Sequence, residues 1–265
     1  MQPLDNVQSA IVASVTALLG HPHESVRRTA AEALRRIPAN DWQTTVLTAA
    51  LIVQAQQSDP GLALTAVEAL TQLLPTRLEE HAAAIVSLLD HDTAVRRSAV
   101  TLLGVLSPSA LVKVAPALFE AIVKLGASED DLEIETACSL PRLLRLLPTV
   151  ALLPHLATVI ELLRHAFAEV RLTAVALVGS AAGEVAARTA LIARLAALLD
   201  HTGELHSEQV RCAALEALGE VGAVAPATLA TVAEAVLYRL GDPDADVRCA
   251  ALGCLGHAPA LLQPP

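Results

Sequence analysis

The sequence is poor in aromatic residues and contains no long uncharged apolar run. Phe, Trp and Tyr together make up 2% of the 265 residues, so a groove that binds nucleic acid by aromatic stacking is not expected. The mean hydropathy of +0.52 would suit a membrane protein, but no stretch of about 20 residues is free of charges and helix breakers. The hydrophobic residues are therefore expected to form a core, without membrane insertion.

Cysteine pairs, a signal sequence and an excess of basic residues are also lacking. The four cysteines form no C-x-x-C pair, and the first residues show no basic segment followed by an apolar run. Both absences favour a reducing, cytoplasmic location. The formal net charge is −10, and −8 of it falls in residues 126–265. An acidic chain lacks the basic surface of nucleic-acid-binding proteins, so no nucleic-acid partner is expected.

A short phrase beginning Val-Arg recurs along the chain. It starts at Val26, Val95, Val170, Val210 and Val247, with weaker copies near Leu62 and Ile134. Successive starts lie 33 to 40 residues apart, a period typical of solenoids, whose units bury their apolar faces against their neighbours. The sequence thus predicts an all-α fold, an α-solenoid of about seven antiparallel helix pairs in a single domain over residues 1–265. The units are expected at roughly 1–38, 39–75, 76–108, 109–148, 149–182, 183–222 and 223–265.

Each unit is expected to contain a helix A, a short turn, a helix B and a loop with Pro or Gly. The A helices are predicted at roughly 5–19, 41–57, 78–89, 110–125, 150–164, 184–199 and 226–240. The B helices are predicted at roughly 25–37, 61–74, 93–106, 130–147, 169–181, 207–221 and 245–257. Pro141 falls inside the fourth B helix, where its missing N–H predicts a kink or break.

The unit resembles a HEAT repeat. In that family an Asp in the A–B turn and an Arg early in helix B recur, and they form a ladder between stacked units. The matching acids are Asp59, Asp90 or Asp92, Asp200, and Asp242 or Asp244, and the matching arginines are Arg27, Arg96, Arg171, Arg211 and Arg248. Ala63 and Glu135 replace the Arg in units two and four, so the ladder should be interrupted there. The resemblance implies a HEAT-like superhelix, an armadillo-like helical array with the B helices on its concave face.

Histidine also recurs, at the ends of A helices. His21, His91, His165 and His201 each follow a Leu-Leu-x sequence. A donor or a cation at that position complements the helix C-terminus, where carbonyl groups lack partners. Because these residues are spread one to a unit, and no zinc-motif spacing is present, no metal site is expected.

No residues with catalytic chemistry converge in the sequence. Residues 179–183 do not match G-x-S-x-G, and no glycine-rich loop joins a strand to a helix as a phosphate site requires. We expect no enzymatic activity and no cofactor. The first hypothesis is a non-catalytic scaffold or adaptor that binds another protein or peptide. The alternative is a HEAT-like lyase or chaperone subunit that acts on a bound client, of the phycobilin lyase type.

The expected binding surface is a strip along the B helices. With the Val of each phrase at offset zero and 100° per residue, offsets 0, 4, 8 and 11 face the core, whereas offsets 2, 6 and 9 face away from it. The strip changes from charged to small and apolar, which suits a partner helix or extended peptide; a solvated face without a ligand is the alternative. The candidate protein-binding residues are Arg28, Glu32, Arg35, Arg97, Thr101, Leu172, Ala176, Cys212, Glu216 and Cys249.

The last B helix is apolar nearly all round, whereas the terminal unit of a solenoid needs a polar outer face. Arg248 is the only charged residue between Val247 and Leu255. We hypothesise that this end is a contact surface formed by Leu252 and Leu255, used for self-association or for docking a partner, or that the chain continued there originally.

Overall fold

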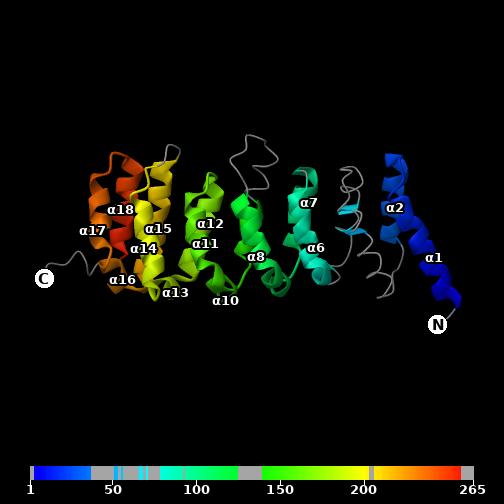
Figure 1. Ribbon diagram of the computed structural model, residues 1–265, viewed down its shortest axis with the longest axis horizontal. Helices are drawn as coiled ribbons and strands as arrows, with labels where there is room; N and C mark the ends of the chain where they lie inside the picture. Colours follow the sequence, from blue (N-terminus) through cyan, green and yellow to red (C-terminus); the bar gives the residue numbers. More distant parts are fainter. Residues whose placement is uncertain are drawn as a thin grey trace. The chain divides into compact units, whose positions relative to one another are not determined.

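The described part of the chain is built of α-helices and short 3₁₀ turns, with no strand (Figure 1). The computed structural model describes residues 3–36, 51–52, 55, 66–67, 70, 78–91, 93–124, 139–202 and 206–257, without the side chains of residues 3–9, 31, 34–36 and 94. The chain divides into two compact units. Unit 1 comprises Met1–Ala121 and Asp130–Ser139, and unit 2 comprises Ile122–Glu129 and Leu140–Pro265.

Unit 1 begins with a helix pair that matches the first predicted A and B helices. The helices described in this part of the chain are α1 (Pro3–Leu18), α2 (Glu24–Arg36), η1 (Glu79–His81), α6 (Ala82–Ser87), η2 (Leu88–Asp90), α7 (Thr93–Gly104) and α8 (Pro108–Lys124). Pro108 is the first residue of α8, where its missing N–H costs nothing. The second predicted helix pair lies almost wholly outside the described residues, and so does Asp59.

The B helices of unit 2 whose full length is described are α12 (Ala168–Ser180), α15 (Ser207–Val224) and α18 (Ala245–Gly256). Its other elements are α10 (Thr149–Leu152), η3 (Leu153–His155), α11 (Leu156–Glu161), η4 (Leu162–Arg164), α13 (Ala182–Ala186), α14 (Thr189–Leu199), α16 (Pro226–Ala230), α17 (Ala233–Tyr238) and η5 (Arg239–Gly241). Helix α15 packs against both α12 and α18. These three helices carry the site described below.

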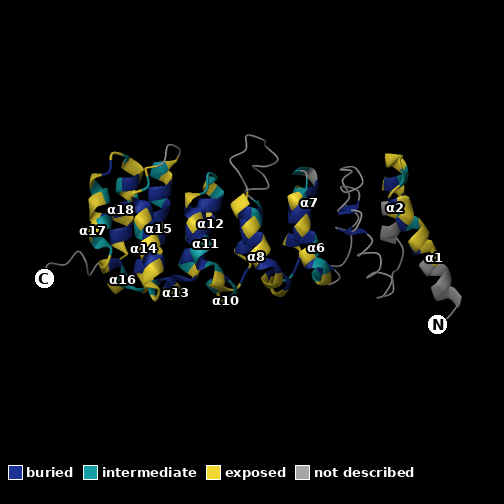
Figure 2. Ribbon diagram, viewed as in Figure 1, coloured by how far each residue is buried: buried dark blue, intermediate teal, exposed yellow. Residues whose placement is uncertain are grey.

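The repeated phrase explains why the B helices pack side by side. In α15 the residues at offsets 0, 4, 8 and 11, which are Val210, Ala214, Leu218 and Val221, are all buried (Figure 2). The same offsets are buried in α12. Small Ala side chains let neighbouring helices approach closely, and each buried Val or Leu contributes about 1.5–3 kcal/mol to folding. The predicted core positions are confirmed in these helices.

The A helices of unit 2 are segmented, although the sequence predicted continuous ones. The helix expected at 150–164 contains the two 3₁₀ turns η3 and η4, and Pro154 in η3 has no N–H to donate to a carbonyl four residues earlier. The helix expected at 184–199 is interrupted at Arg188, whose backbone is extended. Pro141 is buried in helical residues 139–144. The kink predicted there stays a prediction, because residues 125–138 lie outside the described part.

The recurrent arginines bind the turns between the A and B helices. In five units the guanidinium donates hydrogen bonds to backbone carbonyl groups of the preceding turn or helix end. The bonds run from Arg27 to His21 and Pro22 (3.1 and 3.0 Å), from Arg96 to Leu89 and His91 (2.9 and 3.0 Å), from Arg171 to His165 and Ala166 (2.6 Å each), from Arg211 to His201 (3.1 Å), and from Arg248 to Asp242 and Pro243 (2.7 and 3.0 Å). These bonds confirm the structural interpretation of the arginines.

Two of the recurrent histidines use Nδ1 as a hydrogen-bond acceptor in the turn that follows the A helix. Nδ1 of His21 accepts the backbone N–H of His23 at 3.1 Å, and Nδ1 of His165 accepts that of Phe167 at 3.2 Å. The imidazole is thus an acceptor that shapes the turn. The predicted capping role, as a donor or a cation at the helix end, stays a prediction.

Candidate binding groove on the B helices of unit 2

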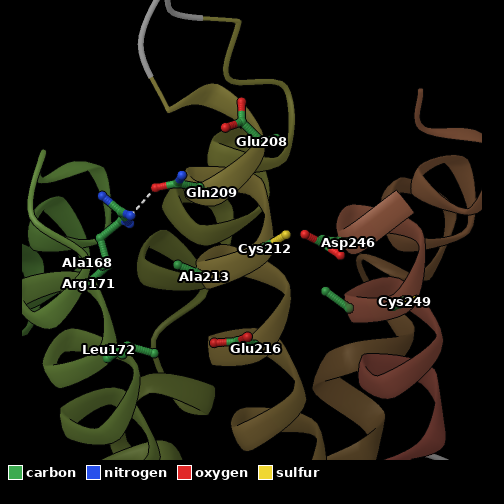
Figure 3. A pocket seen from close by; sticks show the side chains of 11 residues that line it. Ala168, Arg171, Leu172, Glu208, Gln209, Cys212, Ala213, Glu216, Asp246 and Cys249 are labelled. Carbon is green, nitrogen blue, oxygen red and sulfur yellow. Dashed lines mark hydrogen bonds between the residues drawn. The ribbon is translucent and has the colours of Figure 1, made fainter. Parts of the chain in front are cut away.

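A groove of about 540 Å³ runs along α12, α15 and α18 (Figure 3). We call it the B-helix groove. Helix α15 forms its floor, α12 lies on one side and α18 lies on the other. Its lining residues are Ala168, Arg171 and Leu172 from α12, Glu208, Gln209, Cys212, Ala213 and Glu216 from α15, and Asp246, Cys249 and Ala250 from α18.

Four of the predicted strip residues meet in this groove. Leu172, Cys212, Glu216 and Cys249 line it together, as expected for equivalent positions on neighbouring B helices. Ala176 is half-buried one turn further along α12 and does not line it. The strip residues of unit 1, which are Arg28, Glu32, Arg97 and Thr101, are exposed, but no described groove contains them. The side chain of Arg35 lies outside the described residues.

One edge of the groove lies outside the strip predicted from the sequence. Glu208, Gln209 and Asp246 lie one or two residues before the Val of their phrase, at offsets −2 and −1. These offsets are one helical turn before offset 2, so they continue the same exposed strip. Extending the helical period backward by one turn would have identified them.

Two positions assigned to exposed surfaces are covered in the structure. Leu255 is 4% exposed, whereas Leu252 is 61% exposed, so only Leu252 of the proposed C-terminal contact surface is accessible. Leu255 sits at offset 8, a core position, which accounts for its burial. Gly219, at offset 9 of α15, is also buried, and a Cβ atom there would lie 3.1 Å from the His257 ring.

Carboxylates dominate the charge of the groove. Glu208, Glu216 and Asp246 line it, and Arg171 is the one cation among the lining residues. Burial lowers the pKa of Arg171, while the nearby charge of Glu208 raises it. Arg171 also donates to two backbone carbonyl groups and, through Nη2, to Oε1 of Gln209. The positive charge of Arg171 offsets the negative charge of Glu208. No lining residue offsets the negative charges of Glu216 and Asp246.

Of the two cysteines that line the groove, Cys212 has its thiol held in the protonated form. Burial, followed by the charges of Asp244, Glu216 and Asp246, raises the pKa of Cys212 to about 11, against a lowering by the charge of Arg211. Figure 3 shows the Asp246 carboxylate directed toward the Cys212 sulfur. A neutral thiol is a poor nucleophile and a poor metal ligand. Within the described ranges, no group of three His, Cys, Asp or Glu residues could hold a metal ion.

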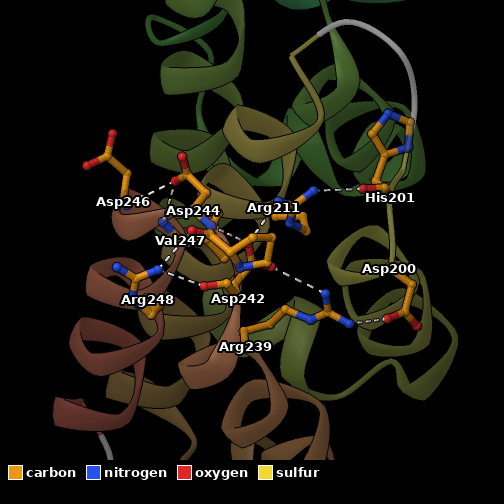
Figure 4. A network of polar contacts seen from close by, with 10 residues as sticks. Asp200, His201, Arg211, Arg239, Asp242, Asp244, Asp246, Val247 and Arg248 are labelled. Carbon is orange, nitrogen blue, oxygen red and sulfur yellow. Dashed lines mark hydrogen bonds and ion pairs between the residues drawn. The ribbon is translucent and has the colours of Figure 1, made fainter.

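A buried ionic cluster supports the end of the groove between α15 and α18 (Figure 4). Asp242, just before α18, accepts from Arg211 Nη2 of α15 at 2.9 Å, from Arg239 Nη1 at 3.4 Å and from the Asp244 backbone N–H at 3.1 Å. We call these four residues the Asp242 cluster. Asp244 in turn caps α18, accepting the N–H groups of Asp246 and Val247. The cluster therefore fixes α18 against α15.

The cluster confirms one rung of the predicted ladder and corrects another. Arg211 and Asp242 come from successive units, as the resemblance implied. Asp200, another of the predicted acids, pairs with Arg239 at 2.6 Å and not with a recurrent arginine of a B helix. Arg239 belongs to η5, and the 3₁₀ turn that ends this A helix brings its guanidinium between the two aspartates.

Solved structures resemble this chain at low sequence identity. No protein-family model matches it, and no curated protein matches it. In the described residues, no helix is long and apolar enough to cross a membrane. Among solved structures, the karyopherin Kap121p bound to the SUMO protease Ulp1p matches 96% of this chain, with a TM-score of 0.62 and 17% identity.

Two further structures of the same karyopherin match 98% of the chain at 15% identity. The one bound to Nup53p has a TM-score of 0.58, and the one bound to the extreme C-terminus of the protein phosphatase Cdc14p has a TM-score of 0.50. This chain covers 29% of the karyopherin in the Ulp1p and Nup53p complexes and 34% in the Cdc14p complex, so it spans about a third of their length. Together with the helix pairs and the arginine contacts, these likenesses show that the chain has the fold of a HEAT-like, all-α solenoid.

Proposed function

We propose that this protein is a non-catalytic scaffold or adaptor that holds a segment of a partner protein in the B-helix groove. The observation that carries the proposal is the groove itself, an open channel of about 540 Å³ formed by three consecutive B helices. A channel of this kind accommodates an extended peptide or one face of a helix. Three solved structures with this fold are of a karyopherin bound to protein partners, which supports a binding role.

The chemistry of the lining supports binding over catalysis. The cysteines of the lining are Cys212, whose pKa is raised to about 11, and Cys249. A thiol with so high a pKa is protonated at neutral pH and is a poor nucleophile. Apolar contact area, in contrast, is available: Leu172 is 57% exposed on the wall of the groove. A large exposed leucine in a concave setting is typical of a protein contact surface.

Filling the groove tests the proposal. Peptides of random sequence would be displayed and selected on the purified full chain, and the enriched ones measured by calorimetry. Cys249→Trp should weaken their binding at least about tenfold, because the indole occupies the groove from an exposed position. Leu237→Trp on α17, which is exposed but outside the groove, is the matched control and should bind normally. Peptides that bind Cys249→Trp as well as the wild type would overturn the proposal.

A further inference from the structure

The B-helix groove carries charge that the protein itself does not balance. Neither Glu216 nor Asp246 forms an ion pair with any residue of the described ranges, whereas other carboxylates there, such as Glu161 and Asp242, do. The one cation of the lining, Arg171, is bound to backbone carbonyl groups and to Gln209. Two negative charges are thus left facing the groove, without a described partner.

Helix electrostatics explain some of these carboxylates but not all. Glu208 and Asp246 lie in the first turns of α15 and α18, where a negative charge stabilises the helix dipole. Glu216 lies in the middle of α15, more than two turns from its start, so the dipole gives no reason for its position. Burial raises the pKa of Glu216, which means that its charged form is less stable in the folded protein than in water.

The surroundings of Glu216 suit the side chain of a basic residue. Leu172 and Glu216 point toward each other from α12 and α15 in Figure 3, so an apolar surface lies beside a carboxylate. Lysine and arginine combine an aliphatic stem with a cationic head in this way. Glu208 and Glu216 are eight residues apart on one helix, about 12 Å along its axis. This spacing leaves room for more than one basic side chain along the groove.

We infer that the partner segment bound in the B-helix groove is basic, with a Lys or Arg side chain lying against Leu172 and pairing with Glu216 and Asp246. The inference rests on the proposed function and adds the chemistry of the partner to it. A small divalent cation is not the occupant, because no three metal-binding side chains converge within the described residues. The ion pairs would form in a partly desolvated channel, where they are stronger than on an open surface.

The test uses the selected peptides and conservative charge removals in the full chain. Glu216→Gln and Asp246→Asn keep the shape of each side chain and should each weaken binding about tenfold. Glu234→Gln removes an exposed carboxylate of α17 outside the groove and should leave binding unchanged. Replacing the basic residues of a peptide by norleucine should have the same effect as Glu216→Gln, and raising the salt concentration should weaken the wild-type complex.

A charge exchange separates this inference from the scaffold proposal. Asp246→Lys should reject the basic peptide and accept a version in which the paired Lys is replaced by Glu. If the enriched peptides are neutral or acidic and ignore Glu216→Gln, yet are lost with Cys249→Trp, the basic partner is wrong and the scaffold stands. If Cys249→Trp has no effect, the scaffold proposal fails as well. Thermal melting of each variant shows whether it is folded.

Discussion

The carboxylates of the Asp242 cluster and of the B-helix groove differ in what surrounds them, although α15 contributes residues to both places. In the Asp242 cluster, the side chain of Asp242 is 1% exposed and accepts three hydrogen bonds, from Arg211, from Arg239 and from a backbone N–H. Burial alone would raise the pKa of Asp242, but these bonds and the charge of Arg211 outweigh it and hold the pKa below its ordinary value. In the groove, Glu216 has no such partner and burial raises its pKa.

The contrast separates a structural site from a binding site. A buried carboxylate that is fully paired stabilises the fold in which its partners are held, whereas Glu216, exposed at the groove surface but partly desolvated, costs a little stability until a ligand supplies the missing charge. The recurrent arginines of the B helices occur in five units because each A–B turn has the same backbone carbonyl groups that need hydrogen-bond donors. The groove carboxylates Glu208, Glu216 and Asp246 lie at three different offsets and do not recur in this way, as expected if each unit meets a different part of a partner.

Removing Arg211 should have the largest effect on stability. Arg211→Ala leaves Asp242 buried without its main cation and frees the His201 carbonyl, so we expect a loss of about 3–5 kcal/mol in the free energy of unfolding. Urea unfolding followed by circular dichroism measures it. Arg28→Ala removes an exposed ion pair with Glu24 and should cost at most about 1 kcal/mol. Equal losses in the two variants would contradict a structural role for the cluster.

The pH dependence of stability should reveal the lowered pKa of Asp242. Because that pKa lies below the ordinary value of 3.8, ionised Asp242 stabilises the fold above this pH, and the stabilisation is lost as the pH falls through the lower, folded-state value. Asp242→Asn should therefore be less stable than the wild type at neutral pH, and the difference should shrink in acid. A difference that stays constant with pH would show that ionisation of Asp242 does not matter.

Removing Arg171 should have a smaller effect, because it leaves no buried charge behind. Arg171→Ala deprives the His165 and Ala166 carbonyl groups of their donor, which should cost about 1–3 kcal/mol. Denaturant unfolding measures the loss, and Arg188→Ala, an exposed residue with one long bond of 3.4 Å to Leu153, is the comparison. If Arg171→Ala melts like the wild type but loses peptide binding, Arg171 belongs to the site and not to the scaffold.

The sequence predicts those parts of the molecule that are repeated. The Val-Arg phrase gave the helix pairs, the buried offsets of α15 and the arginine contacts with the turns, because a periodic signal reports the same local environment many times. The prediction from the repeat failed where a single contact departs from the repeated pattern. Asp200 pairs with Arg239 because the 3₁₀ turn η5 places Arg239 there, and nothing in the repeated motif predicts this turn. The acidic edge of the groove was missed because Glu208 and Asp246 precede the phrase that defined the strip.

The smallest expected effect, and the one with the opposite sign, belongs to Glu216. Since burial raises its pKa, ionised Glu216 destabilises the fold at neutral pH, and this cost disappears once the pH falls below the ordinary carboxyl value of 4.5. Glu216→Gln should therefore leave the free energy of unfolding unchanged or raise it by up to about 0.5 kcal/mol at neutral pH, and it should give no gain in acid.

Urea unfolding at both pH values, with Glu234→Gln as the exposed control, measures the effect of Glu216→Gln. A clear loss of stability would mean that Glu216 has an intramolecular partner and that the two sets of carboxylates do not differ. A basic peptide should stabilise the wild type more than Glu216→Gln, because only the wild type regains the cost of its unpaired charge on binding.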